Sequence, residues 1–242
     1  YLPFFEVLKD FKDIKINLHF SGFLFSWLLE KKPEYIALLQ ALKKQGQIEI
    51  ISGGMYEPVL SLIPEEDGLS QIIMHSTLME EIFGEKPKGL WLAERVYEPH
   101  IPRVLNKAGM SYTLVDDNHF KAIGLQEDDL FGYYVTEHEG YKLAIFPGLE
   151  FLRYSIPFKP LNVLNAYLRE ADKKGHQLAV FGDDGEKFGL WPGTKKSVYD
   201  EGWLKGFFEY LTESQKWLKT VTFSEYLANK PPKGPIYLDC QS

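Results

Sequence analysis

Short apolar runs alternate with longer amphipathic segments along most of this chain. Alternating apolar and polar positions predict a strand at residues 14–20 and another at 47–51. The same reading gives further strands at residues 89–94, 112–115 and 178–181. Apolar residues three or four positions apart predict the helices between them, at residues 33–44, 64–83, 99–107, 161–174 and 202–211. This alternation of strands and helices is typical of a parallel α/β sheet or barrel.

The pattern changes after residue 132. Two apolar segments, at 133–136 and 142–146, predict a hairpin that turns at Glu139 and Gly140. The last elements we expect are two short strands, at residues 218–223 and 236–238, with a helix at residues 224–229 between them. No internal repeat or linker interrupts the chain, so we predict one domain over residues 1–242.

Composition narrows the classes of protein that fit. The chain has 242 residues, of which 45% are hydrophobic and 15% aromatic, enough for the core of one barrel-type domain. A net charge of −7 without a basic block argues against a nucleic-acid partner. No apolar run approaches the roughly 18 residues that span a bilayer, so we expect no membrane partner. The single cysteine, Cys240, allows no intrachain disulfide and fits a reducing compartment such as the cytoplasm.

Acids and histidines gather where the predicted strands end. In parallel folds the carboxyl ends of the strands meet on one face, where active sites are built. No Gly-x-Ser-x-Gly elbow, phosphate-binding Gly-x-x-x-x-Gly-Lys loop or His-x-x-x-His pair occurs, so those chemistries lack support. The polar residues at or near strand ends are His19, Glu49, Glu94, Asp116, Asp117, His119, Asp183, Asp184 and Glu186.

The stretch from residue 180 to 194 is the most unusual part of the sequence. Three acids occur within four positions directly after an apolar run, and Trp191 follows them. Folding alone would not favour such crowding, because like charges repel and push pKa values up. An ordinary acidic turn with a surface tryptophan is the simpler interpretation, and a metal held by Asp183, Asp184 and His119 also fits the spacing.

Two carboxylates in different environments are what glycoside chemistry requires. One stays ionised and attacks the sugar, while the other holds a proton for the leaving oxygen. Glu94 and Asp184 lie at the ends of separate predicted strands, and each has a tryptophan nearby, Trp91 and Trp191. Arg95 could keep a carboxylate ionised, although an ordinary surface pair between Glu94 and Arg95 is the simpler interpretation of those two residues.

These residues lie in longer motifs that resemble glycoside hydrolase family 57. The motifs that carry the resemblance are Gly46-Gln47-Ile48-Glu49-Ile50, Trp91-Leu92-Ala93-Glu94-Arg95-Val96 and the run from Phe181 to Trp191. Shorter stretches that are also similar are found at residues 19–22, 56–58 and 152–154. Within the family, the chain is most similar to the group of α-amylases and 4-α-glucanotransferases.

The resemblance implies a fold and a reaction. The fold is an incomplete (β/α)7 barrel, here without the family's first strand and its C-terminal part, so that the domain is truncated at both ends. The reaction retains anomeric configuration on an α-1,4-glucan such as starch or glycogen, or on a maltooligosaccharide. Glu94 is implied as nucleophile and Asp184 as general acid/base. The residues implied to lie near the substrate are Glu49, Trp91, Glu186, Trp191, His119, His19 and Asp183. No metal or organic cofactor is required.

Several alternatives stay open at this point. The sequence does not choose between transfer to another glucan and hydrolysis by water. A metal-dependent hydrolase similar to polysaccharide deacetylases, and a non-catalytic carbohydrate-binding fragment, are the rival functions. For His19, a hydrogen-bonded histidine at a strand end is an equally good interpretation. The oligomeric state is also open, a homo-oligomer included.

Overall fold

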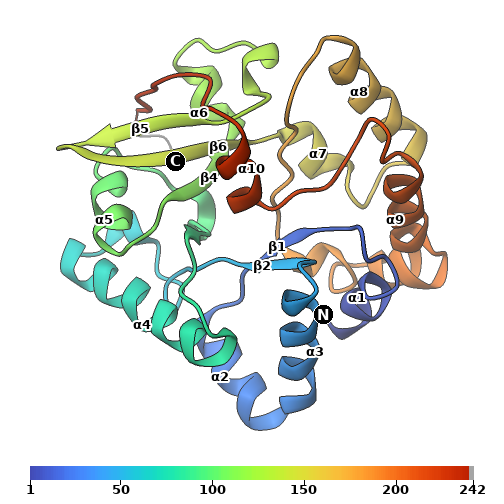
Figure 1. Cartoon of the computed structure of the whole chain (residues 1–242), viewed down its shortest axis with the longest axis horizontal. Helices are drawn as coiled ribbons and strands as arrows, with labels where there is room; N and C mark the ends of the chain where they lie inside the picture. The colour runs from blue at the N-terminus through green and yellow to red at the C-terminus, as the bar shows by residue number, and fades with distance from the viewer. Residues whose placement is uncertain (240–242) are drawn as a thin grey trace.

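Parallel strands form the centre of the molecule, and helices lie around them (Figure 1). The computed structural model describes residues 1–239. In one sheet β1 (Ile16–Leu18) pairs with β2 (Ile48–Ile50) in parallel. The other sheet has the order β3-β4-β6-β5, in which only the β5–β6 pair is antiparallel. Its strands are β3 (Gly89–Leu90), β4 (Tyr112–Asp116), β5 (Tyr134–His138) and β6 (Tyr141–Gly148).

A single bridge joins the two sheets into one curved layer. Ser52 pairs in parallel with Leu90, and its carbonyl accepts a hydrogen bond of 2.8 Å from the Trp91 amide. Beyond β6, the amide of Leu149 donates to the carbonyl of Val180 at 2.9 Å. Residues 178–181 are therefore neighbours of β6, as a strand there would be. They do not form a regular strand, so the prediction of a strand at 178–181 was wrong. The segment faces a cavity on its other side and lacks a second ladder.

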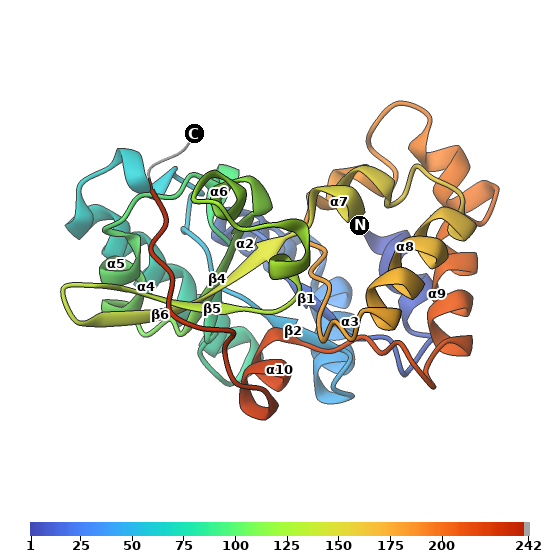
Figure 2. The same ribbon diagram turned by 90° about the horizontal axis from the view of Figure 1, so that it is seen from above.

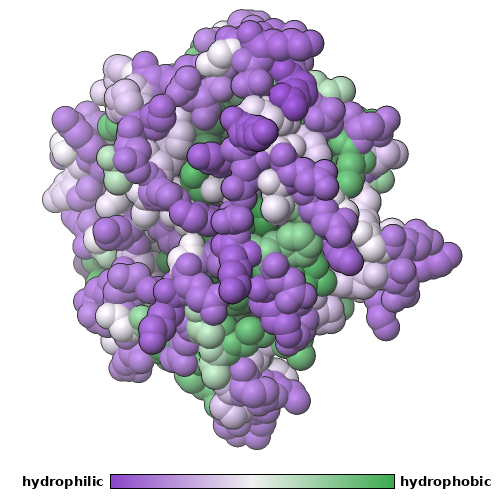
Figure 3. All heavy atoms as spheres, turned by 45° about the vertical axis from the view of Figure 1, so that its right-hand side comes forward, coloured by the Kyte–Doolittle hydropathy of each residue, from purple (hydrophilic) through white to green (hydrophobic). Residues whose placement is uncertain are grey.

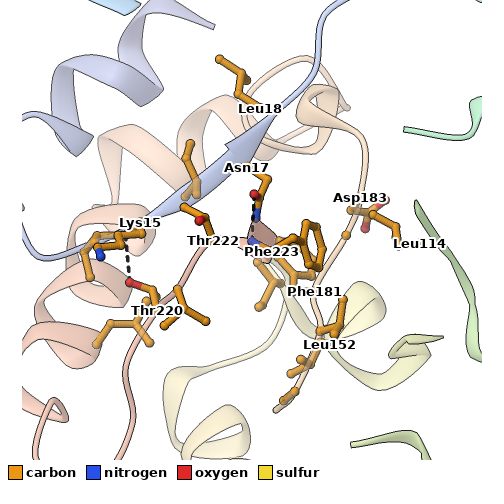
Figure 4. Close-up of a pocket in the computed structure, with 18 of the residues that line it drawn as sticks. Lys15, Asn17, Leu18, Leu114, Leu152, Phe181, Asp183, Thr220, Thr222 and Phe223 are labelled. Atoms are coloured by element: carbon orange, nitrogen blue, oxygen red, sulfur yellow. Dashed lines mark hydrogen bonds between the residues drawn. The ribbon is translucent and has the colours of Figure 1, made fainter. Parts of the chain in front are cut away.

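This cavity interrupts the barrel between β1 and residues 178–186 (Figure 4). Its volume is about 970 Å³, and residues 215–223 also line it. The backbone amide of Lys15, directly before β1, donates to Thr220 Oγ1 at 2.8 Å, and the Phe223 amide donates to Asn17 Oδ1 of β1 at 3.2 Å. Parallel strands that do not close on one another confirm the expected α/β class and incomplete barrel.

Helices cover the strands on both sides, as the view from above shows (Figure 2). The predicted helices are present as α3 (Pro33–Lys44), α4 (Glu65–Phe83), α5 (Ile101–Lys107), α8 (Leu161–Lys173), α9 (Trp203–Glu213) and α10 (Phe223–Asn229). Their apolar stripes face the hydrophobic core; Ile72 and Met79 of α4, for example, are fully buried. The structure adds short helices that periodicity did not reveal: α1 (Leu2–Leu8), α2 (Gly22–Lys31), α6 (Asp117–Ala122) and α7 (Glu150–Ser155).

Several predicted strands are shorter or absent. Those predicted at 14–20 and 47–51 are shortened to β1 and β2, and three other segments depart further from the prediction. Residues 218–222 run beside β1 through the side-chain contacts given above, and Phe223 already begins α10. Residues 234–236 follow β5, where the Val135 amide and carbonyl bond to Gly234 and Ile236 at 3.0 and 2.9 Å. The strand predicted at 89–94 ends at Leu90. In each case the backbone has partners, but too few in succession to form a regular ladder.

The surface drawn in Figure 3 is mostly hydrophilic, in keeping with the charged composition, with one apolar area near the middle of that face. Among the described residues, no helix is both long and apolar enough to cross a bilayer. Cys240, on which the expectation about the redox compartment rests, lies outside the described residues.

Candidate active site

The chain makes an unusual turn directly after β3. Glu94 and Arg95 both have φ of +55°, in the left-handed region that side chains rarely adopt. Each such residue costs on the order of 1–3 kcal/mol, and this kind of strain concentrates at functional sites. The turn leaves Glu94 exposed to solvent while Arg95 is buried. It therefore presents the predicted nucleophile at the end of a barrel strand.

Arg95 links this turn to two other parts of the site. Its Nε lies 3.1 Å from Asp116 Oδ1 at the end of β4, and its Nη1 lies 3.7 Å from Asp184 Oδ1. The guanidinium carbon is also 5.5 Å from the centre of the Trp91 ring. The sequence predicts Arg95 only as a partner of a carboxylate. In the structure it joins the ends of β3 and β4 to the acidic stretch.

His119 packs against the same turn. Its side chain is buried, its ring hydrogen-bonds to the backbone of Arg95, and the ring of Tyr97 lies 6.2 Å away between centroids. Burial lowers the pKa of His119, and the hydrogen bond to Arg95 opposes that shift. A neutral, buried imidazole in this position contacts the backbone next to Glu94. A direct contact between His119 and substrate stays a prediction.

Asp183 and Asp184 are consecutive, yet their side chains have different environments. The Asp183 side chain is 1% exposed, whereas that of Asp184 is 45% exposed. Asp183 is paired with the buried Lys187, and its Oδ1 accepts the Asp184 amide at 2.9 Å. Burial raises the pKa of the Asp183 carboxyl, while Lys187 and Arg153 oppose that change. Of the two acids, Asp184 is therefore the one that a substrate can reach.

Glu186 and Trp191 lie on the loop that follows. Glu186 accepts a hydrogen bond of 2.6 Å from the Tyr1 hydroxyl, and both burial and this acid raise the pKa of that hydroxyl. The Trp191 ring is 44% exposed and stacks on Phe158 with centroids 5.9 Å apart. An exposed indole backed by a second ring is a flat apolar surface of the kind that a sugar ring can cover.

His19 has a carboxylate partner that sequence analysis did not propose. Its Nε2 lies 3.1 Å from Glu57 Oε1, and this hydrogen bond lowers the pKa of the Glu57 carboxyl. A Cβ at Gly53 would stand only 2.2 Å from the imidazole, so glycine is needed for the close approach. Glu57 falls in the 56–58 stretch of the family resemblance, which was the available signal.

Glu49 points toward the N-terminus of α10. Its carboxylate accepts hydrogen bonds from the Tyr112 hydroxyl at 2.6 Å and from the amide of Ser224 at 3.1 Å. An anion at the start of a helix is favoured by the helix dipole. These contacts place Glu49 between β2 and α10, and its role in substrate binding stays a prediction.

The structure brings together most, but not all, of the residues proposed from sequence. Around the cavity at the barrel opening lie His19, Glu57, Trp91, Asp183, Asp184 and Glu186. Glu94 and His119 join this group through Arg95, whereas Trp191 joins it through Lys187, whose Nζ is 5.2 Å from the indole centre. Within residues 1–239, no group of three or more acidic, histidine or cysteine side chains has the arrangement of a metal site.

Comparison with known proteins identifies the family. The sequence model of Glycosyl hydrolase family 57 matches residues 1–239. The chain belongs to this family. It is 46% identical over 243 residues to a 4-alpha-glucanotransferase of Thermococcus litoralis and 45% identical to alpha-amylase 1 of Dictyoglomus thermophilum. Each match covers all of this chain but only 37% and 35% of those relatives, so the chain spans little more than a third of their length.

Solved structures agree with this family assignment. The crystal structure of the 4-alpha-glucanotransferase from Thermococcus litoralis superposes with a TM-score of 0.94 at 45% identity, over 99% of this chain and 38% of that one. A putative polysaccharide deacetylase from Mycobacterium smegmatis, at 16% identity and a TM-score of 0.55 over 90% of this chain and 79% of that one, shares the fold alone. Membership of family 57 thus favours the glycosidase interpretation over the deacetylase one.

Proposed function

We propose that the protein is a retaining enzyme that cleaves α-1,4-glucosidic bonds, with Glu94 as nucleophile and Asp184 as general acid/base. The observation that carries the proposal is the bridge by Arg95, which brings the exposed carboxylate of Asp184 to the turn that presents Glu94. Retaining glycosidases need two carboxyl groups close to one sugar carbon, one ionised and one able to give a proton.

The proposed reaction has two steps. Glu94 attacks the anomeric carbon while Asp184 gives its proton to the departing oxygen, which leaves a glycosyl group bonded to Glu94. Asp184 then takes a proton from the incoming acceptor, and the acceptor oxygen displaces Glu94 with a second inversion, so that the configuration is retained. Exposed Trp191 and half-buried Trp91 supply apolar surfaces for neighbouring sugar rings.

The acceptor decides between two activities. Water gives hydrolysis, and the hydroxyl of another glucan gives transfer. The relatives named above include both a glucanotransferase and an amylase at nearly equal identity, so both outcomes belong to the proposal. Maltotriose distinguishes them, because transfer yields glucose together with longer maltooligosaccharides, whereas hydrolysis yields shorter sugars only.

Glu94→Gln tests the nucleophile. This nearly isosteric change removes the attacking charge, and we expect kcat to fall by on the order of 10⁴-fold with the melting temperature unchanged. Glu85→Gln is the matched control, since Glu85 is an exposed glutamate in a surface pair with Lys43. Normal turnover by Glu94→Gln would overturn the assignment. Binding of maltooligosaccharide by the unmodified protein without any product would instead indicate a carbohydrate-binding role.

A cytoplasmic location is a further part of the proposal and rests on the single cysteine of the sequence. Fractionation of the native host checks it. The oligomeric state, a homo-oligomer included, is settled by sedimentation of the purified protein.

A further inference from the structure

Lys187 is a buried cation beside the proposed active site. Its side chain is 3% exposed, and its Nζ donates to the Asp183 carboxylate and, at 3.0 Å, to the carbonyl of Arg153. Removing an ammonium group from water costs several kcal/mol unless it is paired and hydrogen-bonded. Both conditions are met here.

Aromatic rings enclose the same ammonium group. Its Nζ lies 5.2 Å from the centre of the Trp191 ring and 5.6 Å from each of the rings of Tyr154 and Phe158. A cation within about 6 Å of a ring centre is attracted by the ring quadrupole, by up to about 2 kcal/mol where water is excluded. Lys187 therefore contacts the exposed indole of Trp191, to which the proposed function assigns sugar binding.

Through Asp183, the ammonium group of Lys187 is also connected to the proposed general acid/base, Asp184. One oxygen of Asp183 receives the Lys187 bond, and the other accepts the backbone amide of Asp184 at 2.9 Å. The position of Asp184 along the chain is thus set by a carboxylate that Lys187 holds in place.

Other charges surround this pair. Arg153 of α7 places Nε 3.7 Å from Asp183 Oδ1 and donates from Nη1 to Asp116 at 2.6 Å. Arg95 lies between Asp116 and Asp184. Positive and negative groups therefore alternate from Lys187 to Asp184, and Asp183 has Lys187 and Arg153 as its cationic neighbours. Removing Lys187 leaves the buried Asp183 charge only partly compensated.

We propose that Lys187 is a positioning residue that holds both the general acid/base Asp184 and the sugar platform Trp191 in their working places. The inference rests on the proposed function for the roles of those two residues. One buried ammonium group would thus hold two parts of the proposed site, Asp184 through the Asp183 carboxylate and Trp191 through a cation–π contact.

Lys187→Met tests the inference, with Lys195→Met as control. Lys195 is exposed at the start of the next helical segment and carries the same charge. In Lys187→Met we expect kcat/KM on glucan to fall about tenfold to a hundredfold, because small displacements of catalytic groups have effects of this size. KM should rise as well, since the contact between the ammonium group and Trp191 is lost. Lys195→Met should match the unmodified protein in both respects.

A double variant separates positioning from simple stability. Adding Asp183→Asn to Lys187→Met removes the unpaired buried charge, while the asparagine carbonyl still accepts the Asp184 amide. We expect the double variant to regain the melting temperature lost by Lys187→Met. It should not regain KM, because the contact between the ammonium group and Trp191 is still missing.

Tryptophan fluorescence gives a readout that needs no turnover. The emission of Trp191, obtained as the difference between each protein and its Trp191→Phe counterpart, should change in Lys187→Met but not in Lys195→Met. A folded Lys187→Met protein with unchanged emission and KM would overturn the inference. Absence of glucan turnover in the unmodified protein would count against the proposed function instead, and the fluorescence comparison would still decide whether Lys187 holds Trp191.

Discussion

Arg95 Nη1 lies 3.7 Å from Asp184 Oδ1, across the gap between two segments that are 89 residues apart in the chain. The same guanidinium group lies against Asp116 and faces Trp91. Because Arg95 directly follows Glu94 in a left-handed turn, this contact fixes where the turn stands relative to the acidic loop. The proposed nucleophile and acid/base thus lie on two separate segments, one after β3 and the other after residues 178–181, and the buried Arg95 connects these segments.

The two adjacent aspartates should respond differently to the same change. Asp184→Asn removes the exposed carboxyl, and we expect kcat to fall about 10²–10⁴-fold with stability unchanged. Asp183→Asn leaves Lys187 buried without its counter-charge, which should cost about 3–5 kcal/mol of unfolding free energy. Kinetics and urea denaturation on both variants measure this contrast. Equal effects on stability would show that the difference in burial has no energetic consequence.

Arg95→Lys should impair catalysis more than its conservative appearance suggests. Lysine keeps the charge but cannot span Asp116 and Asp184 with a planar fork, so we expect kcat/KM to fall about tenfold. Arg103→Lys is the control, because Arg103 also pairs with two acids, Glu65 and Glu139, but does so on α5. Unchanged kinetics in Arg95→Lys would argue that the bridge is not needed.

Removing the indole of Trp191 should weaken substrate binding more than it slows the chemical step. In Trp191→Ala we expect KM for maltooligosaccharides to rise about tenfold, as loss of an aromatic contact of roughly 1–1.5 kcal/mol implies, with a smaller change in kcat. Trp27→Ala removes an indole of similar exposure, 46% against 44%, from α2 and should leave KM unchanged. An equal rise in KM for both variants would contradict a specific sugar platform.

The buried His75 should make the protein less stable in acid. Burial lowers the pKa of His75 to about 4, with the neighbouring His19 adding to the shift and Glu57 and the Phe20 carbonyl opposing it. The unfolded chain takes up this proton near pH 6.5, whereas the folded chain resists it until about pH 4. Stability should therefore fall by on the order of 3 kcal/mol as pH drops through that window.

Denaturation at pH 7, 5 and 4 checks the His75 prediction. His75→Gln, which still offers hydrogen-bonding groups to Ser52, should flatten the dependence on pH. His138→Gln is the control, because the His138 side chain is 30% exposed on β5. If His75→Gln kept the full loss of stability in acid, the cause would lie in other groups.

Local pattern and motif predicted much of this protein correctly. The helices α3, α4, α8 and α9 were found from apolar spacing, because each must bury one stripe in the hydrophobic core. The order of strands and helices indicated a parallel sheet or barrel, and the family resemblance added that the barrel is incomplete. The stretch from 181 to 191 placed the proposed acids on a loop after an apolar run, which is where the structure has them.

Contacts between distant residues decided the rest. The sequence by itself determined which chemical groups are present and the order of the elements that carry them. It could not show that Asp183 is buried and Asp184 exposed, because that depends on Lys187, Arg153 and the rings around them. Nor could it show the left-handed turn at Glu94, which is strained on its own and is held by partners from β4 and α6. Only the folded chain brings those partners within hydrogen-bonding distance. Because the opposite charges of the buried side chains neutralise one another, they can be removed from water without unfolding the protein.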